Sequence, residues 1–255
     1  MDTGLRTLKW QLDPATFFAD AVGPPDPWQA DLLRSESKNI ILNASRQSGK
    51  SQVTAIMALH RALFNPESLV LVLAPALRQS QELFQKILQA LRDLGTNFPI
   101  TPAAERRLSL ELENKSRILT LPGSEKTIRG FSSVDLLIMD EASRVPDELY
   151  FAVRPMLAVS GGSLVMLSTP WGKRGAFYEA WESPVGWEKY RIPATEVDRI
   201  TPEFLEEERN ALPPWVYRQE YECAFEETEE QVFTSDLIDR AVTSEVKPLF
   251  GAGDV

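Results

Sequence analysis

One stretch constrains the fold more than any other: the apolar run Ile40–Leu42 leads through a short polar turn into Gly49-Lys50-Ser51. A strand, a tight turn and a helix in this order present backbone N–H groups to an anion at the positive end of the helix dipole. In such a loop the lysine reaches the β- and γ-phosphates of a nucleotide, and the serine hydroxyl holds Mg²⁺. The stretch therefore predicts a nucleotide site built from Ser45, Arg46, Gln47, Ser48, Gly49, Lys50 and Ser51.

One position departs from the common loop pattern G-x-x-x-x-G-K-[ST], because Ala44 stands where the first glycine belongs. Alanine enters positive φ less freely than glycine, so we expect the chain to enter this loop by a different turn. The alternative interpretation is a plain polar turn between a strand and a helix. The apolar strand before it and the helix after it favour the nucleotide site.

A second apolar run, Val134–Met139, ends in two neighbouring acids, Asp140 and Glu141. At the carboxyl end of a sheet strand, Asp140 is placed to hold Mg²⁺ through water. Glu141 is placed to polarise a water for in-line attack on the γ-phosphate. Two acids after a strand also suit a helix N-cap, but the upstream phosphate loop favours a catalytic pair. A further run ends in Ser168 and Thr169, whose hydroxyls could sense the γ-phosphate.

Apolar runs of strand length alternate with helix-period segments along the chain, which indicates a mainly parallel sheet covered on both faces. Arg107–Glu113 alternates apolar and polar residues and predicts a β-hairpin with Ser116–Leu121, inserted at the sheet edge. Four prolines predict an irregular lead-in over residues 1–38. We expect three parts: a core at 1–195 that includes this lead-in, an acidic helical subdomain at 196–225, and a linker at 226–255.

Composition limits the possible functions without deciding between them. The 255-residue chain has a net charge of −10, but 14 of its 37 acidic and 3 of its 27 basic residues lie between Glu196 and Asp239. The rest is close to neutral, so a local basic stripe can still meet phosphate. The lone Cys223 excludes an internal disulfide and fits a reducing compartment. No signal pattern or membrane-length apolar run is present, so we expect a soluble intracellular protein.

Two further features each have an alternative interpretation. The Gln29 amide offers a donor and an acceptor that match an adenine edge, or it is a surface side chain beside a core tryptophan. The predicted helix Ala76–Leu94 turns Arg78, Lys86 and Arg92 toward its polar side. That side either lies along a nucleic-acid backbone or is an ordinary solvated helix face.

Four motifs follow one another along the chain: Trp28-Gln29, A-S-R-Q-S-G-K-S, L-L-I-M-D-E and L-S-T-P-W-G. In this order they resemble the ATPase domain of the large terminase subunit of tailed bacteriophages, the motor that packages viral DNA. The similarity runs from about residue 26 to about residue 225, and the combination is far more specific than any single motif. Alanine at the start of the loop and Arg46 within it are typical of that family's deviant loop.

The resemblance implies an α/β P-loop fold of the additional-strand, catalytic-glutamate type, with a strand between those carrying Lys50 and Asp140. It implies Mg-ATP bound by Gln29, the loop, Lys50 and Ser51, with Asp140 on the Mg²⁺ side and Glu141 as catalytic base. Ser168 and Thr169 would match the coupling motif. A basic residue would face the γ-phosphate, either Arg46 in the same chain or Arg129 from a neighbouring subunit; a surface salt bridge is the other role open to Arg129.

The resemblance also implies partners: double-stranded DNA, a homo-oligomeric ring expected to be a pentamer, the capsid portal protein and the small terminase subunit, all in the host cytoplasm. Complete members carry a nuclease domain after the ATPase, and this sequence ends before one, so we expect no DNA cleavage by this chain alone. Two alternatives remain open: a two-lobed helicase-like ATPase, which needs a second lobe, and a nucleotide-dependent clamp without turnover, which does not need Glu141.

Overall fold

One continuous sheet forms the centre of the molecule. The computed structural model describes residues 3–95, 102–123 and 130–227. The eight strands of this sheet lie in the order β3-β4-β5-β2-β6-β7-β1-β8. The strand bounds are β1 (Asn39–Ala44), β2 (Leu69–Ala74), β3 (Pro102–Arg106), β4 (Ser109–Leu112), β5 (Arg117–Pro122), β6 (Leu136–Asp140), β7 (Ser163–Ser168) and β8 (Glu188–Ile192).

The strand order confirms the predicted fold class. β1 carries the loop that ends in Lys50, β6 ends in Asp140, and β7 lies between them and pairs in parallel with both. The additional strand expected between the two is therefore β7, and it brings Ser168 to the same sheet edge. The pairs of β2 with β5 and β6, and of β1 with β8, are also parallel.

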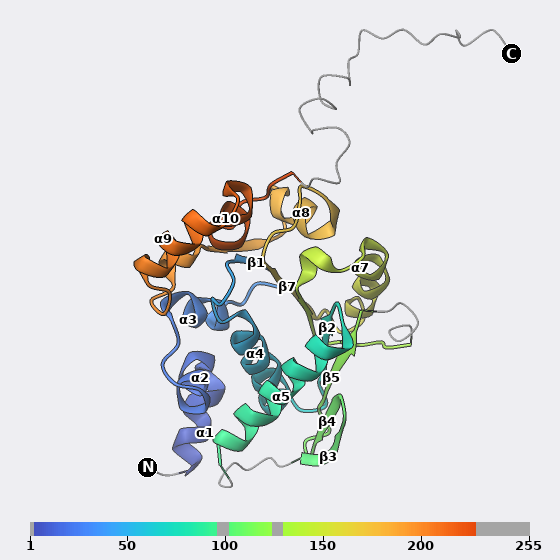
Figure 1. Cartoon of the computed structure of the whole chain (residues 1–255). Helices are drawn as coiled ribbons and strands as arrows, with labels where there is room; N and C mark the ends of the chain where they lie inside the picture. Colours follow the sequence, from blue (N-terminus) through green and yellow to red (C-terminus); the bar gives the residue numbers. More distant parts are fainter. Residues whose placement is uncertain (1–2, 96–101, 124–129, 228–255) are drawn as a thin grey trace, which may run out of the picture.

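Helices cover both faces of this sheet (Figure 1). The helix bounds are α1 (Thr3–Leu12), α2 (Pro14–Ala21), α3 (Pro27–Arg34), α4 (Lys50–Phe64), α5 (Leu77–Asp93), α7 (Asp147–Val153), α8 (Gly175–Glu182), α9 (Pro202–Ala211) and α10 (Pro214–Tyr221). Helices α1 to α5 share one apolar cluster with the sheet, and α7 and α8 share the other. Because both faces are covered, β2 and β6 are buried at every position. All of these residues are apolar except Asp140, which ends β6.

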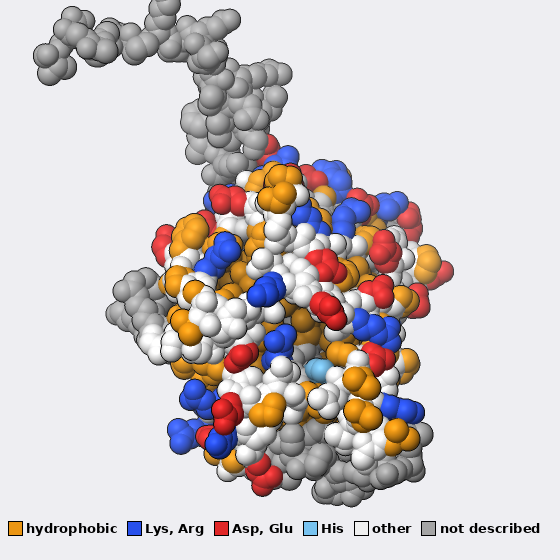
Figure 2. All heavy atoms as spheres, turned by 180° about the vertical axis from the view of Figure 1, so that it is seen from behind, with side chains coloured by type: hydrophobic (Ala, Val, Ile, Leu, Met, Phe, Trp, Pro, Cys, Tyr) orange, Lys and Arg blue, Asp and Glu red, His pale blue; other side chains and the backbone are white. Residues whose placement is uncertain are grey.

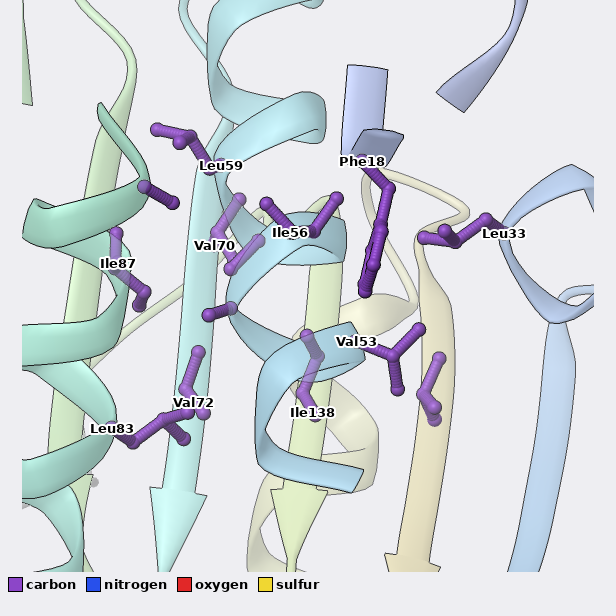
Figure 3. Close-up of a cluster of buried hydrophobic side chains, with 14 of the residues drawn as sticks. Phe18, Leu33, Val53, Ile56, Leu59, Val70, Val72, Leu83, Ile87 and Ile138 are labelled. Carbon is purple, nitrogen blue, oxygen red and sulfur yellow. The ribbon is translucent and has the colours of Figure 1, made fainter. Parts of the chain in front are cut away.

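Helix α4 occupies the centre of the larger cluster, so the loop before it rests on a packed base. Figure 3 shows Val53 and Ile56 of α4 among the buried side chains of this cluster, together with Val70 of β2 and Ile138 of β6. These side chains are completely buried. A fully buried aliphatic side chain of this size contributes roughly 1.5–3 kcal/mol, so the helix start is held firmly relative to β1 and β6.

The lead-in is helical and not irregular, which corrects the expectation for residues 1–38. Pro14 and Pro27 each occupy the first turn of a helix, where the missing N–H costs nothing because it has no intrahelical partner. Asp13 caps α2, its side chain accepting from the backbone N–H of Ala15 at 3.1 Å. The prolines therefore mark helix starts, and the buried Phe17 of α2 packs into the core.

The edge hairpin is present, with one more strand than predicted. β4 and β5 pair antiparallel, close to the predicted segments, although Arg107 and Leu108 lie in a turn and not in a strand. The unpredicted third strand of this edge region is β3. It is exposed along its whole length, so it lacks the alternation that identifies a half-buried strand. β5 continues the main sheet through its parallel pairing with β2.

At the carboxyl edge, α9 and α10 pack around a small cluster formed by Ala194, Leu205, Tyr217 and Tyr221. Acidic and basic side chains are interspersed over the face of the molecule seen in Figure 2. Across the described segments, no helix combines the length and apolarity that a bilayer crossing requires.

Candidate functional site

The loop between β1 and α4 has the geometry of an anion cradle. Ala44, which replaces the first glycine of the common loop pattern, is the last residue of β1 and is completely buried. This position therefore belongs to the strand and not to the turn. The left-handed conformations lie further on, at Gln47 (φ 60°) and Gly49 (φ 98°). Gly49 is the N-cap of α4, which places the loop at the positive end of that helix.

Lys50 is held at the site by three hydrogen bonds. Its Nζ donates to the carbonyl oxygens of Ala44 (3.1 Å) and Ser45 (2.8 Å) and to Thr169 Oγ1 (3.1 Å). Burial lowers the pKa of Lys50, and the negative charges of Glu141 and Asp140 oppose that shift. The ammonium group is therefore held between the loop and the tip of β7, near both predicted acids.

Asp140 and Glu141 have different environments. Asp140 ends β6 and is 6% exposed; burial, reinforced by the charge of Glu141, raises its pKa to about 7 despite the opposing effect of Lys50. Glu141 is left-handed (φ 50°) and partly exposed. Ser168 Oγ donates to Glu141 Oε2 at 3.4 Å. Glu141 lines the cavity described next, and its left-handed backbone is a strained conformation of the kind that clusters at functional sites.

A cavity of about 590 Å³ opens over the loop. Its lining combines most of the predicted phosphate loop with the catalytic candidate and with residues of α5 and the segments after β6 and β7. The lining residues are Arg46, Gln47, Ser48, Gly49, Lys50, Ser51, Gln52, Gln79, Lys86, Glu141, Arg144 and Thr169. A volume of this size lies within the range of pockets that bind small molecules and cofactors.

Arg46 is tied to the helical segment at the other end of the chain. Its guanidinium forms an ion pair with Glu220 of α10, and its backbone N–H donates to the Glu220 carbonyl oxygen at 3.1 Å. The ion pair raises the pKa of Arg46. Arg46 also lines the cavity, so this cation is both inside the site and linked to α10.

Gln29 lies beside the loop and is 3% exposed, so it is not a surface residue. Its Oε1 accepts from the Asp26 backbone N–H at 2.9 Å, at the start of α3. Its Nε2 lies 2.8 Å from the position that a Cβ on Gly49 would take. The amide oxygen thus accepts one hydrogen bond at the helix start, and the amide nitrogen faces the loop.

The three residues proposed as DNA contacts do not share one environment. Lys86 lines the cavity. Arg78 pairs with Glu82 one turn along α5, on a highly exposed surface. Arg92 donates to Gln89 at 3.2 Å. Arg129, the candidate for a neighbour's contribution, lies outside the described residues.

The structure also brings residues to the site that the sequence interpretation missed. Arg144 lies with its guanidinium carbon 4.0 Å from the centre of the Trp171 ring. Its position just after the acid pair, and that of Trp171 just after S-T-P, was a signal available in the sequence. Glu220 and Arg199 had no local signal, because their contacts with the loop join positions more than 150 residues apart.

Oxygen donors at the site fit a magnesium ion. Ser51 offers a hydroxyl at the start of α4, and Asp140 offers a carboxylate whose raised pKa reflects unfavourable negative charge in a buried place. Hydroxyl and carboxylate oxygens are ligands that Mg²⁺ accepts, commonly alongside water and phosphate.

Comparisons with known proteins agree with this geometry. The large terminase subunit of Thermus virus P23-45 is 28% identical over 262 residues, covering 88% of this chain and 53% of that protein. The ATPase domain of the Thermus phage P74-26 large terminase superposes with a TM-score of 0.75 at 25% identity, covering 84% of this chain and all of that domain. The large terminase of another thermophilic bacteriophage, solved in complex with ATP-gamma-S, shares the fold, with a TM-score of 0.65 and 14% identity over 79% of this chain and 53% of that one.

The chain thus spans about half the length of the relative from P23-45. The family model for the N-terminal part of the T4likevirus-type large terminase subunit matches residues 41–240, which include the loop, the acid pair and α9 and α10. By that match, the chain belongs to the family "Terminase large subunit, T4likevirus-type, N-terminal".

Proposed function

We propose that this chain binds Mg-ATP in the cavity over the loop, hydrolyses it, and uses the reaction to move double-stranded viral DNA into a procapsid. The observation that carries the proposal is the convergence of Lys50, Glu141 and Thr169 on one cavity from three strand ends. Family membership supports the packaging role. The choice of ligand is supported by the thermophilic phage relative, whose large terminase was solved with ATP-gamma-S bound.

The chain's own residues have distinct roles in this proposal. The loop N–H groups and Lys50 hold the β- and γ-phosphates, and Glu141 orients the attacking water and accepts its proton. Arg46 is the cation that this chain itself offers to the γ-phosphate, and Arg129 is the candidate from a neighbouring subunit. Ser51 and Asp140 would hold Mg²⁺, which neutralises charge on the phosphates during transfer.

Ser168 and Thr169 are proposed to report the state of the nucleotide to the rest of the domain. Ser143 Oγ lies 2.7 Å from Ser168 Oγ and donates to the Thr169 carbonyl oxygen at 2.8 Å. Thr169 contacts Lys50, and Ser168 contacts Glu141. The tip of β7 is therefore hydrogen-bonded to both the phosphate lysine and the proposed base, as a coupling element requires.

The wider role is proposed by resemblance. We infer a pentameric ring on the portal protein, working with the small terminase subunit on double-stranded DNA in the host cytoplasm. The division into an ATPase core at 1–195, an acidic helical subdomain at 196–225 and a linker at 226–255 stays a prediction.

The deciding experiment measures ATP turnover against protein concentration, with and without duplex DNA. A DNA-stimulated rate per subunit that rises steeply with concentration is expected if neighbouring subunits complete the site. Lys50→Ala serves as the control and should lose both binding and turnover. A rate per subunit that is independent of both concentration and DNA would contradict the motor, and a rate equal to that of Lys50→Ala would contradict the site itself.

A further inference from the structure

Arg199, which is not among the described residues that line the cavity, forms a hydrogen bond with the backbone of the phosphate loop. Arg199 lies between β8 and α9, far along the chain from the loop. Its Nη2 donates to the Ser48 carbonyl oxygen at 2.9 Å, and its Nη1 donates to Asp26 Oδ1 at 2.8 Å. One planar guanidinium thus joins the lead-in helix, the loop and the segment before α9.

The contact with Ser48 fixes a peptide plane. A trans peptide is planar, so its C=O and the N–H of the following residue point in opposite directions. Since the Ser48 carbonyl points at Arg199, the Gly49 N–H points away from Arg199. Ser48 and Gly49 line the cavity, whereas Arg199 is absent from the set of described residues that line it. The Gly49 N–H thus lies on the side of the peptide opposite Arg199, and Gly49 itself lines the cavity, where an anion would meet such a donor.

The same surroundings explain why residue 49 is glycine. At φ 98° any other residue is strained. A Cβ there would also lie 2.8 Å from Gln29 Nε2 and 3.2 Å from Arg199 Nη2. The back of the loop is thus packed against these two side chains, so glycine at this position fits the brace that Arg199 forms.

We propose that Arg199 is a positioning residue for the phosphate loop, and that it acts on the polyphosphate part of the nucleotide by holding the Ser48–Gly49 peptide. The proposal rests on the nucleotide site proposed above. Asp26, whose side chain is 13% exposed, fixes the guanidinium by an ion pair. Because Arg199 emerges just before α9, movement of the α9–α10 segment would alter the anion cradle directly through this contact.

The test measures binding of ATP and of tripolyphosphate, which has no base, to wild type and Arg199→Ala. Both affinities should fall by about tenfold, the effect of one hydrogen bond to a charged group. At saturating ATP, kcat should stay within about twofold, because Arg199 does not touch the reacting atoms. A loss with ATP alone would mean that Arg199 contacts the nucleoside, which would overturn the brace.

Two further variants keep the outcome clear. Asp26→Asn retains a good N-cap for α3 but removes the charge that fixes Arg199, so it should show the same pattern with a smaller loss. Arg209→Ala removes an exposed arginine from α9 that pairs with Glu222, away from the loop, and should bind both ligands as wild type does. If Arg199→Ala matches wild type while Lys50→Ala has lost binding, the brace is wrong and the nucleotide site stands; if wild type itself binds neither ligand, the site is wrong.

Discussion

The ammonium group of Lys50 lies 3.1 Å from the hydroxyl of Thr169, which joins the phosphate loop to the tip of the strand between β1 and β6. Both side chains are at least nine-tenths buried, so water does not readily replace this contact. A hydrogen bond to a buried charge contributes roughly 1.5–3 kcal/mol. The position of the lysine therefore depends on a residue 119 positions away in sequence.

Replacing Thr169 tests this contact. Thr169→Val keeps the shape but removes the hydroxyl, so we expect turnover to fall by about ten- to a hundredfold. Thr169→Ser keeps the hydroxyl and should retain most of the activity. Steady-state ATPase assays on both variants measure the effect. Equal activity in the valine variant and wild type would show that Lys50 is held by the loop carbonyls alone.

Glu141→Ala should separate binding from chemistry. Loss of a positioned base costs about 10²–10⁴ in rate, whereas Lys50 and the loop still hold the phosphates. Isothermal titration with ATP should therefore give an affinity near that of wild type while phosphate release disappears. Retained hydrolysis in this variant would remove the base assignment, and Ser168, its hydrogen-bond partner, offers no replacement as a base.

Asp140 gives a prediction about stability. Its pKa is about 7 in the folded protein against 3.8 for an ordinary aspartate, so the folded form binds the extra proton between these values. Stability without metal therefore falls as pH rises from about 4 through 7, and the whole penalty is present above about pH 7. Asp140→Asn removes the charge, so it should raise the free energy of unfolding by roughly 1–3 kcal/mol at about pH 8 and therefore raise the unfolding temperature. The gain should be smaller at about pH 5.

Differential scanning calorimetry without added metal measures this difference, and ATPase assays should show the Asn variant to be inactive. Added Mg²⁺ should stabilise wild type more at about pH 8 than at about pH 6, because ionised Asp140 is the form that binds a cation. A variant less stable than wild type at the higher pH would mean that Asp140 is favourably paired in the folded protein.

The central site was predictable because its signals are local. β1, the loop and α4 form one continuous motif, and the acid pair directly follows β6, so short stretches contain the whole pattern. Their meeting at one sheet edge follows from parallel pairing. In contrast, the lead-in prolines predict a break in regular structure only when each is considered alone. Asp13 followed by Pro14 is also a helix-start signal, and the structure follows that second interpretation.

Contacts between distant segments were beyond sequence reasoning. Glu220 reaches Arg46, and Arg199 reaches Ser48, only after the chain has crossed the whole sheet. Neither residue has a local pattern that distinguishes it from an ordinary surface charge. The same limit applies to Lys86, whose place on the polar side of a helix suggested DNA, whereas the fold lays that position over the cavity.

Lys86 and Arg92 should therefore give different phenotypes. Lys86→Ala should raise the KM for ATP several-fold without DNA, because a cavity cation contributes to phosphate binding. Arg92→Ala should leave basal turnover unchanged and weaken DNA binding, with a salt dependence reduced by about one counterion. ATPase titrations and DNA binding at two salt concentrations measure both effects. If Lys86→Ala affects DNA binding alone, the DNA interpretation of that helix face is right for Lys86 as well.

The arginine that faces the γ-phosphate can be assigned by mixing variants. An Arg129→Ala subunit has an intact Glu141 but supplies no arginine to its neighbour's site. A Glu141→Ala subunit supplies the arginine but lacks the base in its own site. If Arg129 acts between subunits, the mixture should recover activity that neither variant has alone, because some sites combine the intact Glu141 of one chain with the intact Arg129 of the next. Arg46 acts within its own chain, so Arg46→Ala mixed with Glu141→Ala should stay inactive. Suppose instead that neither mixture recovers activity, that Arg46→Ala is inactive alone and that Arg129→Ala is active alone. These results would identify Arg46 as the arginine that acts. Arg46 is also the residue that the structure places in the cavity wall.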